Sequence, residues 1–208
     1  MRSEESVAIA IVGGGPVGMG LALALHKLGV ACEIFDARER GAGLGDRRIL
    51  ALSHGTQQTM AWLDAWQGID ATPIETIHVS QRGRAGRTVI RASDEGVPAL
   101  GHVLSMHELY KTLDAAVTRA GIVYHDNARV SDVIVNAGAA AFTAGATQRT
   151  AQLVAYAEGV VDDTARIGRR HYAQHALTAL VTVERATART AWTVAAVCAT
   201  LAGVSGVA

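Results

Sequence analysis

Six residues near the N-terminus, Gly13-Gly14-Gly15-Pro16-Val17-Gly18, have the types and spacing needed to bind a diphosphate. They contain the pattern G-x-G-x-x-G. The first glycine permits a tight turn, the second lets the backbone approach a pyrophosphate, and the third allows close packing of a helix against a strand. The N–H groups and the positive dipole end of a helix beginning here would face the phosphates. The sequence therefore predicts a nucleotide site at Gly13, Gly14, Gly15, Pro16, Val17 and Gly18.

Asp36 adds a carboxylate suited to the ribose of the same nucleotide. It comes 18 residues after Gly18, at the end of a second apolar segment. A carboxylate in this place accepts hydrogen bonds from ribose hydroxyls. It also disfavours a 2′-phosphate, so NADP is a poor candidate for this particular site.

The elements that must position these residues are a strand, a helix and a second strand. Residues 7–12 form a continuous apolar run, which suits a parallel strand buried on both faces. Residues 16–28 have small and apolar side chains at helical spacing, including Leu28, and Gly29 follows as a C-cap. A strand over 31–35 then leads to Asp36. This context predicts an α/β fold with a Rossmann-like βαβ unit, whereas the glycine pattern alone fits an ordinary turn equally well.

The rest of the chain alternates between helical and extended patterns. Helices are predicted over 56–66 and 106–120, the second with Leu109, Leu113, Ala116 and Val117 on one stripe. Trp62 and Trp66 are interpreted as core residues. Residues 74–80 and 88–92 flank a turn-forming segment and predict a β-hairpin. Three further strands are expected to rejoin the first sheet, over 122–125, 130–135 and 152–157.

Composition excludes several other classes of protein. The chain has 208 residues, half of them apolar, with 19 basic and 19 acidic side chains, which predicts a globular fold and no nucleic-acid-coating surface. Cys32 and Cys198 lie far apart and without metal-ligand spacing, so no metal site is expected. The absence of a signal-peptide pattern at the N-terminus favours a reduced, cytoplasmic protein.

Residues 192–208 differ from the rest because they carry no charge. Their length approaches the roughly 20 residues needed to cross a bilayer, but their Ala, Gly, Thr and Ser content makes a weak anchor. A buried or frayed tail is the alternative interpretation.

Four stretches of the sequence resemble the flavin-dependent hydroxylases of ubiquinone biosynthesis. This family is of the 2-octaprenyl-6-methoxyphenol hydroxylase type, within the p-hydroxybenzoate hydroxylase-like group. The likeness runs from about residue 7 to 192, although members of the family are nearly twice as long. The stretches are residues 11–18 with Asp36, 46–53 (Asp-Arg-Arg-Ile-Leu-Ala-Leu-Ser), 77–83 and 96–101.

The resemblance implies that FAD is the cofactor and that the glycine turn and Asp36 hold its ADP half. It implies that Arg48 lies along the cofactor, near the pyrophosphate or the ribityl chain. The alternative is that Arg48 is a solvent-exposed loop residue with no role in binding. Glu158 and Gly159 match an acid–glycine segment of the family, in which the acid is aspartate. The extra methylene of glutamate shifts the Glu158 carboxylate away from the position expected for the aspartate contact. Gln81 also stands where the family has aspartate.

The reaction implied by the resemblance is hydroxylation of a polyprenyl phenol ring. NAD(P)H reduces FAD, molecular oxygen is the second substrate, and the flavin carries the chemistry, so no residue is assigned as catalytic. The hydrophobic phenolic substrate implies peripheral association with a membrane or with a biosynthetic complex.

The expected organisation is an FAD-binding domain over residues 1–168 with an inserted β segment at about 72–105. The beginning of an incomplete substrate-domain sheet follows at 169–192, and 193–208 is an unassigned apolar tail. The shortness of the chain relative to the family predicts truncation. An NAD-linked dehydrogenase and a non-catalytic or membrane-tethered nucleotide-binding remnant remain alternatives.

Overall fold

The main sheet of the protein has six strands and carries the glycine turn at one of its ends. The computed structural model describes residues 5–81, 86–159, 190–195 and 199–202. The strand order is β8-β2-β1-β11-β10-β9; the first four strands are parallel, and β10 and β9 continue as antiparallel neighbours. The strands are β1 (Glu5–Val12), β2 (Cys32–Phe35), β8 (Val123–His125), β9 (Val130–Asn136), β10 (Ala139–Ala144) and β11 (Thr147–Tyr156).

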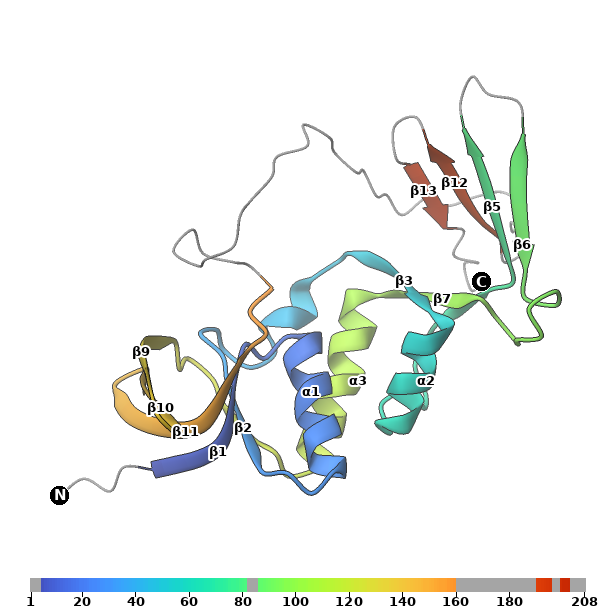
Figure 1. Cartoon of the computed structure of the whole chain (residues 1–208). Coiled ribbons are helices and arrows are strands. Elements are labelled where there is room, and N and C mark those ends of the chain that lie inside the picture. The colour runs from blue at the N-terminus through green and yellow to red at the C-terminus, as the bar shows by residue number, and fades with distance from the viewer. Residues whose placement is uncertain (1–4, 82–85, 160–189, 196–198, 203–208) are drawn as a thin grey trace.

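Two helices, α1 (Pro16–Lys27) and α3 (Met106–Arg119), pack side by side on one face of this sheet (Figure 1). Successive residues of a strand point to opposite faces, so β1 contributes to two cores. Ile11 packs with the helices, whereas Ala10 packs with Phe35 and Phe142 on the other face, over which β9 and β10 curl. Both Ala10 and Ile11 are fully buried, which confirms the two-sided burial expected of residues 7–12.

Two smaller sheets complete the described structure. One has the order β3-β7-β4 and adjoins α2 (His54–Trp62), and the other has the order β13-β12-β5-β6. A short 3-10 turn, η1 (Ala42–Gly45), precedes the first of them. Their strands are β3 (Ile49–Ser53), β4 (Thr72–Ile74), β7 (Gly101–Ser105), β5 (Thr76–Gln81), β6 (Arg87–Arg91), β12 (Thr190–Ala195) and β13 (Ala199–Ala202).

Most of the predicted elements are present. The hairpin of β5 and β6 is confirmed, and β8, β9 and β11 rejoin the first sheet as expected. The α3 stripe is confirmed, because Leu109, Leu113, Ala116 and Val117 are all buried. Ser105 is the N-cap of α3, and its side chain accepts a hydrogen bond from the Glu108 N–H and so satisfies one of the free amides of the first turn.

One predicted core position was wrong, and one helix ends earlier than predicted. Helix α1 ends at Lys27 and the chain turns away at Gly29, so Leu28, the last residue of the predicted helix, is 70% exposed. Trp62 is half exposed and lies beneath the ammonium group of Lys27, 5.9 Å from the ring centroid, whereas Trp66 packs against the core. Both errors arise where a helix ends, because helical periodicity says nothing about the residue at which it stops.

The C-terminal segment was predicted as an unassigned tail, but parts of it form strands. Strand β12 pairs in parallel with β5 and antiparallel with β13. The domain limit expected at residue 168 lies outside the described residues, as does most of the segment 169–192. Within the part of the chain that the structure describes, no helix has both the length and the apolar character to cross a bilayer.

Candidate functional site

The glycine turn lies where the carboxyl ends of β1, β2 and β11 meet. Strand β1 is flanked by β2 on one side and by β11 on the other. The order of the parallel strands therefore reverses direction at β1. In open α/β sheets such a switch point creates a crevice in which ligands bind. The turn is tied to both neighbours: the Gly13 N–H donates to the Phe35 carbonyl oxygen (2.8 Å), and the Ala157 N–H donates to the Val12 carbonyl oxygen (2.7 Å).

Gly13 and Gly18 are glycines because the protein leaves no room for a side chain. Gly13 has a φ of +110°, and a Cβ there would lie 2.6 Å from the Ala157 carbonyl oxygen. A Cβ on Gly18 would overlap the Gly13 carbonyl oxygen, so the start of α1 packs directly against the turn. These are the tight turn and the close helix packing expected from the glycine spacing.

Gly15 is different, because no contact among the described residues requires a glycine there. Its backbone is extended (φ −79°, ψ −179°), and among the described residues no atom would lie within 4 Å of a Cβ. Pro16 follows at the first helical position, and Val17 is 73% exposed. The backbone at this point is therefore open to a group that comes close to it from outside, as a diphosphate does.

The first turn of α1 also keeps its amides available. Helices α2 and α3 are capped by the side chains of Ser53 and Ser105, whereas no side chain among the described residues caps α1, and its first turn holds no acidic residue. Uncapped N–H groups and the positive end of the helix dipole favour an anion. Together with the open Gly15, they fit the diphosphate of a dinucleotide.

Asp36 points toward the glycine turn and is only 4% exposed. Its Oδ2 accepts the Gly14 N–H at 2.7 Å, and its Oδ1 accepts the Arg38 N–H at 2.8 Å. The Arg38 guanidinium lies 3.3 Å from both carboxylate oxygens, and the Tyr124 hydroxyl lies 3.5 Å from Oδ2. The carboxylate is thus held next to the turn, at the end of β2 where a ribose would lie if the phosphates reach α1.

These contacts determine the charge of Asp36. Burial by itself raises the pKa of the carboxyl, but hydrogen bonds from Arg38 and from the Gly14 N–H, with the Arg38 charge, outweigh burial and lower it. A carboxyl whose pKa is lower in the folded state stabilises the protein above its unfolded pKa of about 3.9, and this stabilisation is lost as the pH falls through the folded value.

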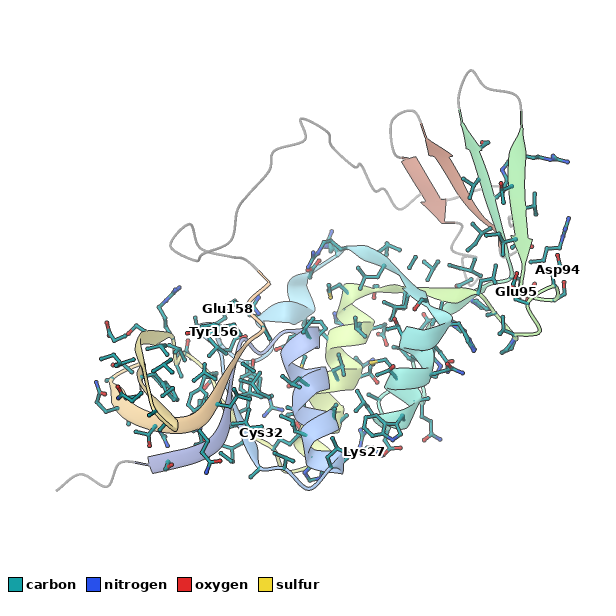
Figure 2. The ribbon with its side chains drawn as sticks, in the orientation of Figure 1. Lys27, Cys32, Asp94, Glu95, Tyr156 and Glu158 are labelled. Carbon is teal, nitrogen blue, oxygen red and sulfur yellow. The ribbon has the colours of Figure 1, made fainter. Side chains whose placement is uncertain are left out.

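We therefore expect Asp36→Asn to remove about 2 kcal/mol of unfolding free energy at pH 7, the size of a hydrogen bond to a charged group. The loss should shrink as the pH falls below 4, because the wild-type carboxyl takes up a proton first in the unfolded state and then, at its lower folded pKa, in the folded state. Urea unfolding between pH 3 and 7 measures both effects. Asp94→Asn is the control, since Asp94 is an exposed carboxylate after β6 (Figure 2), and it should change stability by less than about 0.5 kcal/mol. Equal losses at all pH values would contradict the assignment.

Arg48 lies in the loop before β3, with its side chain 67% exposed. Its guanidinium forms an ion pair with Asp46 (Nη2 to Oδ2, 2.6 Å), and the Asp46 carboxylate also accepts the Arg48 backbone N–H. Hydrogen bonds from the Arg48 side chain lower the pKa of Asp46. A phosphate could be bound by Arg48 only if it shared or replaced this partner.

Glu158 and Gly159 follow β11 and are exposed. Because Gly13 abuts the backbone of Ala157 and Glu158, the structure brings this segment beside the glycine turn, although 145 residues separate Gly13 from Glu158. Figure 2 shows Glu158 at the end of the sheet where α1 begins, and Lys27 at the opposite end of α1. The glycine turn, Asp36, Glu158 and Gly159 therefore converge on one edge of the sheet, whereas Arg48 lies in the loop before β3.

Sequence reasoning missed two residues of this site, Arg38 and Tyr124. Arg38 could have been found, because a cation two residues after a strand-terminal carboxylate is within reach of it. Tyr124 could not, since it lies 88 residues from Asp36 and meets it only through the pairing of β8 with β2.

A family model described as FAD binding domain matches residues 6–189 of the chain. Among curated proteins, an uncharacterized protein of Synechocystis sp. is 29% identical over 117 residues, which are 55% of this chain and 28% of that protein. The chain thus spans less than a third of the length of this relative.

Solved structures of flavoproteins share the fold. The p-nitrophenol 4-monooxygenase PnpA from Pseudomonas putida DLL-E4 is similar with a TM-score of 0.61 and 16% identity, over 74% of this chain and 41% of that one. CtdE in complex with FAD and a substrate has a TM-score of 0.59 and 18% identity, over 73% and 37% of the two chains. A flavoprotein/dehydrogenase from Cytophaga hutchinsonii has a TM-score of 0.56 and 16% identity, over 73% and 39%.

Proposed function

The chain belongs to the family of the FAD binding domain, and from this premise we propose that it is the cofactor-binding part of a monooxygenase that hydroxylates an aromatic ring. The observation that carries the proposal is the open backbone at Gly15, at the start of an uncapped helix beside a buried carboxylate. A diphosphate with a ribose attached would fit all three features, whereas contacts among the described residues account for the buried carboxylate but not for a glycine at position 15.

We assign the ADP half of FAD to the glycine turn, residues Gly13, Gly14, Gly15, Pro16, Val17 and Gly18, and to Asp36. The uncapped amides at the start of α1 would donate to the phosphates, whereas the Gly13 and Gly14 amides stay bonded to Phe35 and Asp36. Asp36 would accept from the ribose. We place Arg48 near the pyrophosphate or the ribityl chain, where it would exchange Asp46 for the cofactor. Glu158 and Gly159 complete the edge of the site opposite Asp36.

FAD, when bound, supplies electron transfer from NAD(P)H and the transfer of one oxygen atom of O2 to the ring, while the other atom leaves as water. The residues described here supply binding and orientation. The turn and α1 hold the phosphates, and Asp36 fixes the ribose, so that the adenine end of the cofactor is anchored to the centre of the sheet.

For the substrate we propose a hydrophobic phenol, specifically the polyprenyl phenol of ubiquinone biosynthesis. The four stretches of resemblance support this choice, and the nitrophenol named for PnpA shows that a protein of the same fold acts on a phenol. A polyprenyl substrate partitions into membranes, so we also propose peripheral contact with a membrane or with neighbouring biosynthetic enzymes.

The cofactor assignment is tested by titrating the purified chain with FAD and following flavin fluorescence. FAD is expected to bind at least about tenfold more tightly than FMN, a difference of ~1.4 kcal/mol, because FMN lacks the ADP half. ADP should displace FAD. If neither FAD nor ADP binds, the cofactor assignment fails.

The same titration separates the alternatives. Binding of NADH without binding of FAD would favour an NAD-linked dehydrogenase. Hydroxylation is tested by supplying the FAD-loaded chain with NAD(P)H, ¹⁸O₂ and a polyprenyl phenol, and by measuring ¹⁸O in the product by mass spectrometry. Binding of FAD without any ¹⁸O incorporation would fit both a non-catalytic nucleotide-binding protein and a cofactor-binding part that lacks the rest of the enzyme.

A further inference from the structure

Tyr124 reaches the glycine turn from the edge of the sheet. Its strand β8 pairs with β2, and the register places it opposite Ile34, two residues before Asp36. The Tyr124 hydroxyl lies 3.5 Å from the Gly14 carbonyl oxygen and 3.5 Å from Oδ2 of Asp36. One phenol therefore touches both the peptide that forms the turn and the carboxylate that we assign to the ribose.

The space beside the turn is filled by this side chain. A Cβ on Gly14 would overlap the Tyr124 hydroxyl and the adjacent ring carbon. Gly14 is buried, and its N–H is the donor in the 2.7 Å hydrogen bond to Asp36. The tyrosine thus packs against the same peptide whose N–H is aimed at the carboxylate.

Arg40 holds Tyr124 from the other side. The Arg40 guanidinium carbon lies 5.0 Å from the centroid of the Tyr124 ring, within the range of a cation–π contact. Arg40 is itself fixed to α3, because its Nε donates to Asp114 Oδ1 (2.7 Å) and its Nη2 donates to the Thr118 hydroxyl (2.6 Å). The ring is therefore clamped between a helix and the glycine turn.

The Tyr124 hydroxyl keeps its proton. Burial raises its pKa, and the neighbouring negative charge of Asp36 raises it further. A neutral hydroxyl has one hydrogen to donate, and the Gly14 carbonyl oxygen and Asp36 Oδ2 are among the acceptors within reach, with the Tyr110 hydroxyl as a further hydrogen-bond partner.

We propose that Tyr124 is a positioning residue of the nucleotide site, which holds the Gly14 peptide and the Asp36 carboxylate in the orientation that receives the ribose hydroxyls. The inference rests on the proposed function, since it assumes that Asp36 meets a ribose. Tyr124 acts through Asp36, so its contribution to binding depends on the ribose hydroxyls and not on the phosphates.

The test compares two ligands that differ only in those hydroxyls, ADP and 2′,3′-dideoxy-ADP, by calorimetric titration of wild type and Tyr124→Phe. The phenylalanine keeps the ring and removes the hydroxyl. The variant is expected to bind ADP about fivefold more weakly, as for the loss of one hydrogen bond, and to bind dideoxy-ADP within about twofold of wild type. Tyr156→Phe is the matched control, because Tyr156 is 62% exposed on β11, and neither ligand should be affected.

Each outcome separates this inference from the assignment of the cofactor. Suppose that wild type binds ADP more tightly than dideoxy-ADP. If Tyr124→Phe then leaves both affinities unchanged, or lowers both equally, the positioning role is overturned while the nucleotide site stands. If wild type binds neither ligand, the proposed function fails and the inference fails with it.

A second variant, Arg40→Lys, tests the same role if Tyr124→Phe does not fold. Arg40→Lys keeps the charge but removes the planar group over the ring, and it should lower the affinity for ADP more than the affinity for dideoxy-ADP. An Arg40→Lys variant that folds and binds both ligands like wild type would overturn the clamp described here.

Discussion

Gly15→Ser is expected to abolish most FAD binding while leaving the folded protein as stable as wild type or more so. Gly15 is the N-cap of α1 and already has the extended backbone that a serine cap adopts. A serine Cβ would meet no described atom within 4 Å, and its hydroxyl would cap the helix as Ser53 and Ser105 cap α2 and α3. The same side chain would occupy the space and the amides that we assign to the diphosphate.

The two effects therefore have opposite signs. Capping should add about 0.3 kcal/mol to the unfolding free energy measured without FAD, because glycine is itself a fair N-cap residue. The affinity for FAD should fall by about 100-fold or more, ~2.7 kcal/mol, because the backbone can no longer approach the phosphates. Urea unfolding and flavin fluorescence measure the two quantities on the same samples.

Gly20→Ser is the matched control for this prediction. Gly20 also lies in α1, and a Cβ there meets no described atom within 4 Å, but it is more than a helical turn away from Gly15. Its variant should bind FAD like wild type. If Gly15→Ser binds FAD within about threefold of wild type, the diphosphate does not lie at this turn.

Gly18→Ala, unlike Gly15→Ser, is expected to lower the stability of the folded protein strongly, because its side chain would clash with neighbouring protein atoms. The added Cβ would overlap the Gly13 carbonyl oxygen and would lie 3.3 Å from Cγ2 of Ile11. Neither neighbour can move easily, since Gly13 is hydrogen bonded to β2 and Ile11 is fully buried. We expect a cost of about 3 kcal/mol, at the upper end for an overpacked core.

Thermal unfolding without FAD measures this loss, which for a chain of this size corresponds to a fall in Tm of about 6–12 °C. Gly20→Ala is the control, because it adds the same methyl group two residues further along the helix without a clash. It should stabilise α1 by about 0.5–1 kcal/mol, since alanine is the better helix former. A Gly18→Ala variant as stable as wild type would show that α1 does not pack on the turn as described.

Local sequence patterns were sufficient to predict the elements around the glycine turn. The apolar run of residues 7–12, the glycine spacing and the strand ending at Asp36 each depend on neighbours within a few residues, so their periodicity is visible in the chain. The buried stripe of α3 was predicted for the same reason. Short strands of mixed composition were missed, namely β3, β4, β7 and β10, because their burial is supplied by partners that are distant in sequence.

The contacts within the site could not be predicted in this way. Tyr124 and Asp36 meet because β8 pairs with β2, and Glu158 lies beside Gly13 because β11 pairs with β1. Arg48 was predicted from resemblance alone, and only the structure shows that Asp46 already pairs with it. Each of these contacts depends on strand order, which short-range patterns do not encode.

The sequence by itself determined that a helix begins at Pro16, directly after glycines and a buried strand, and that a carboxylate ends the next strand. Only the tertiary structure decided which glycine serves the fold and which is open to a ligand. All four glycines of the turn look alike in the sequence. The atoms that exclude a Cβ at Gly13, Gly14 and Gly18, and leave room for one at Gly15, are placed by chain folding over long distances.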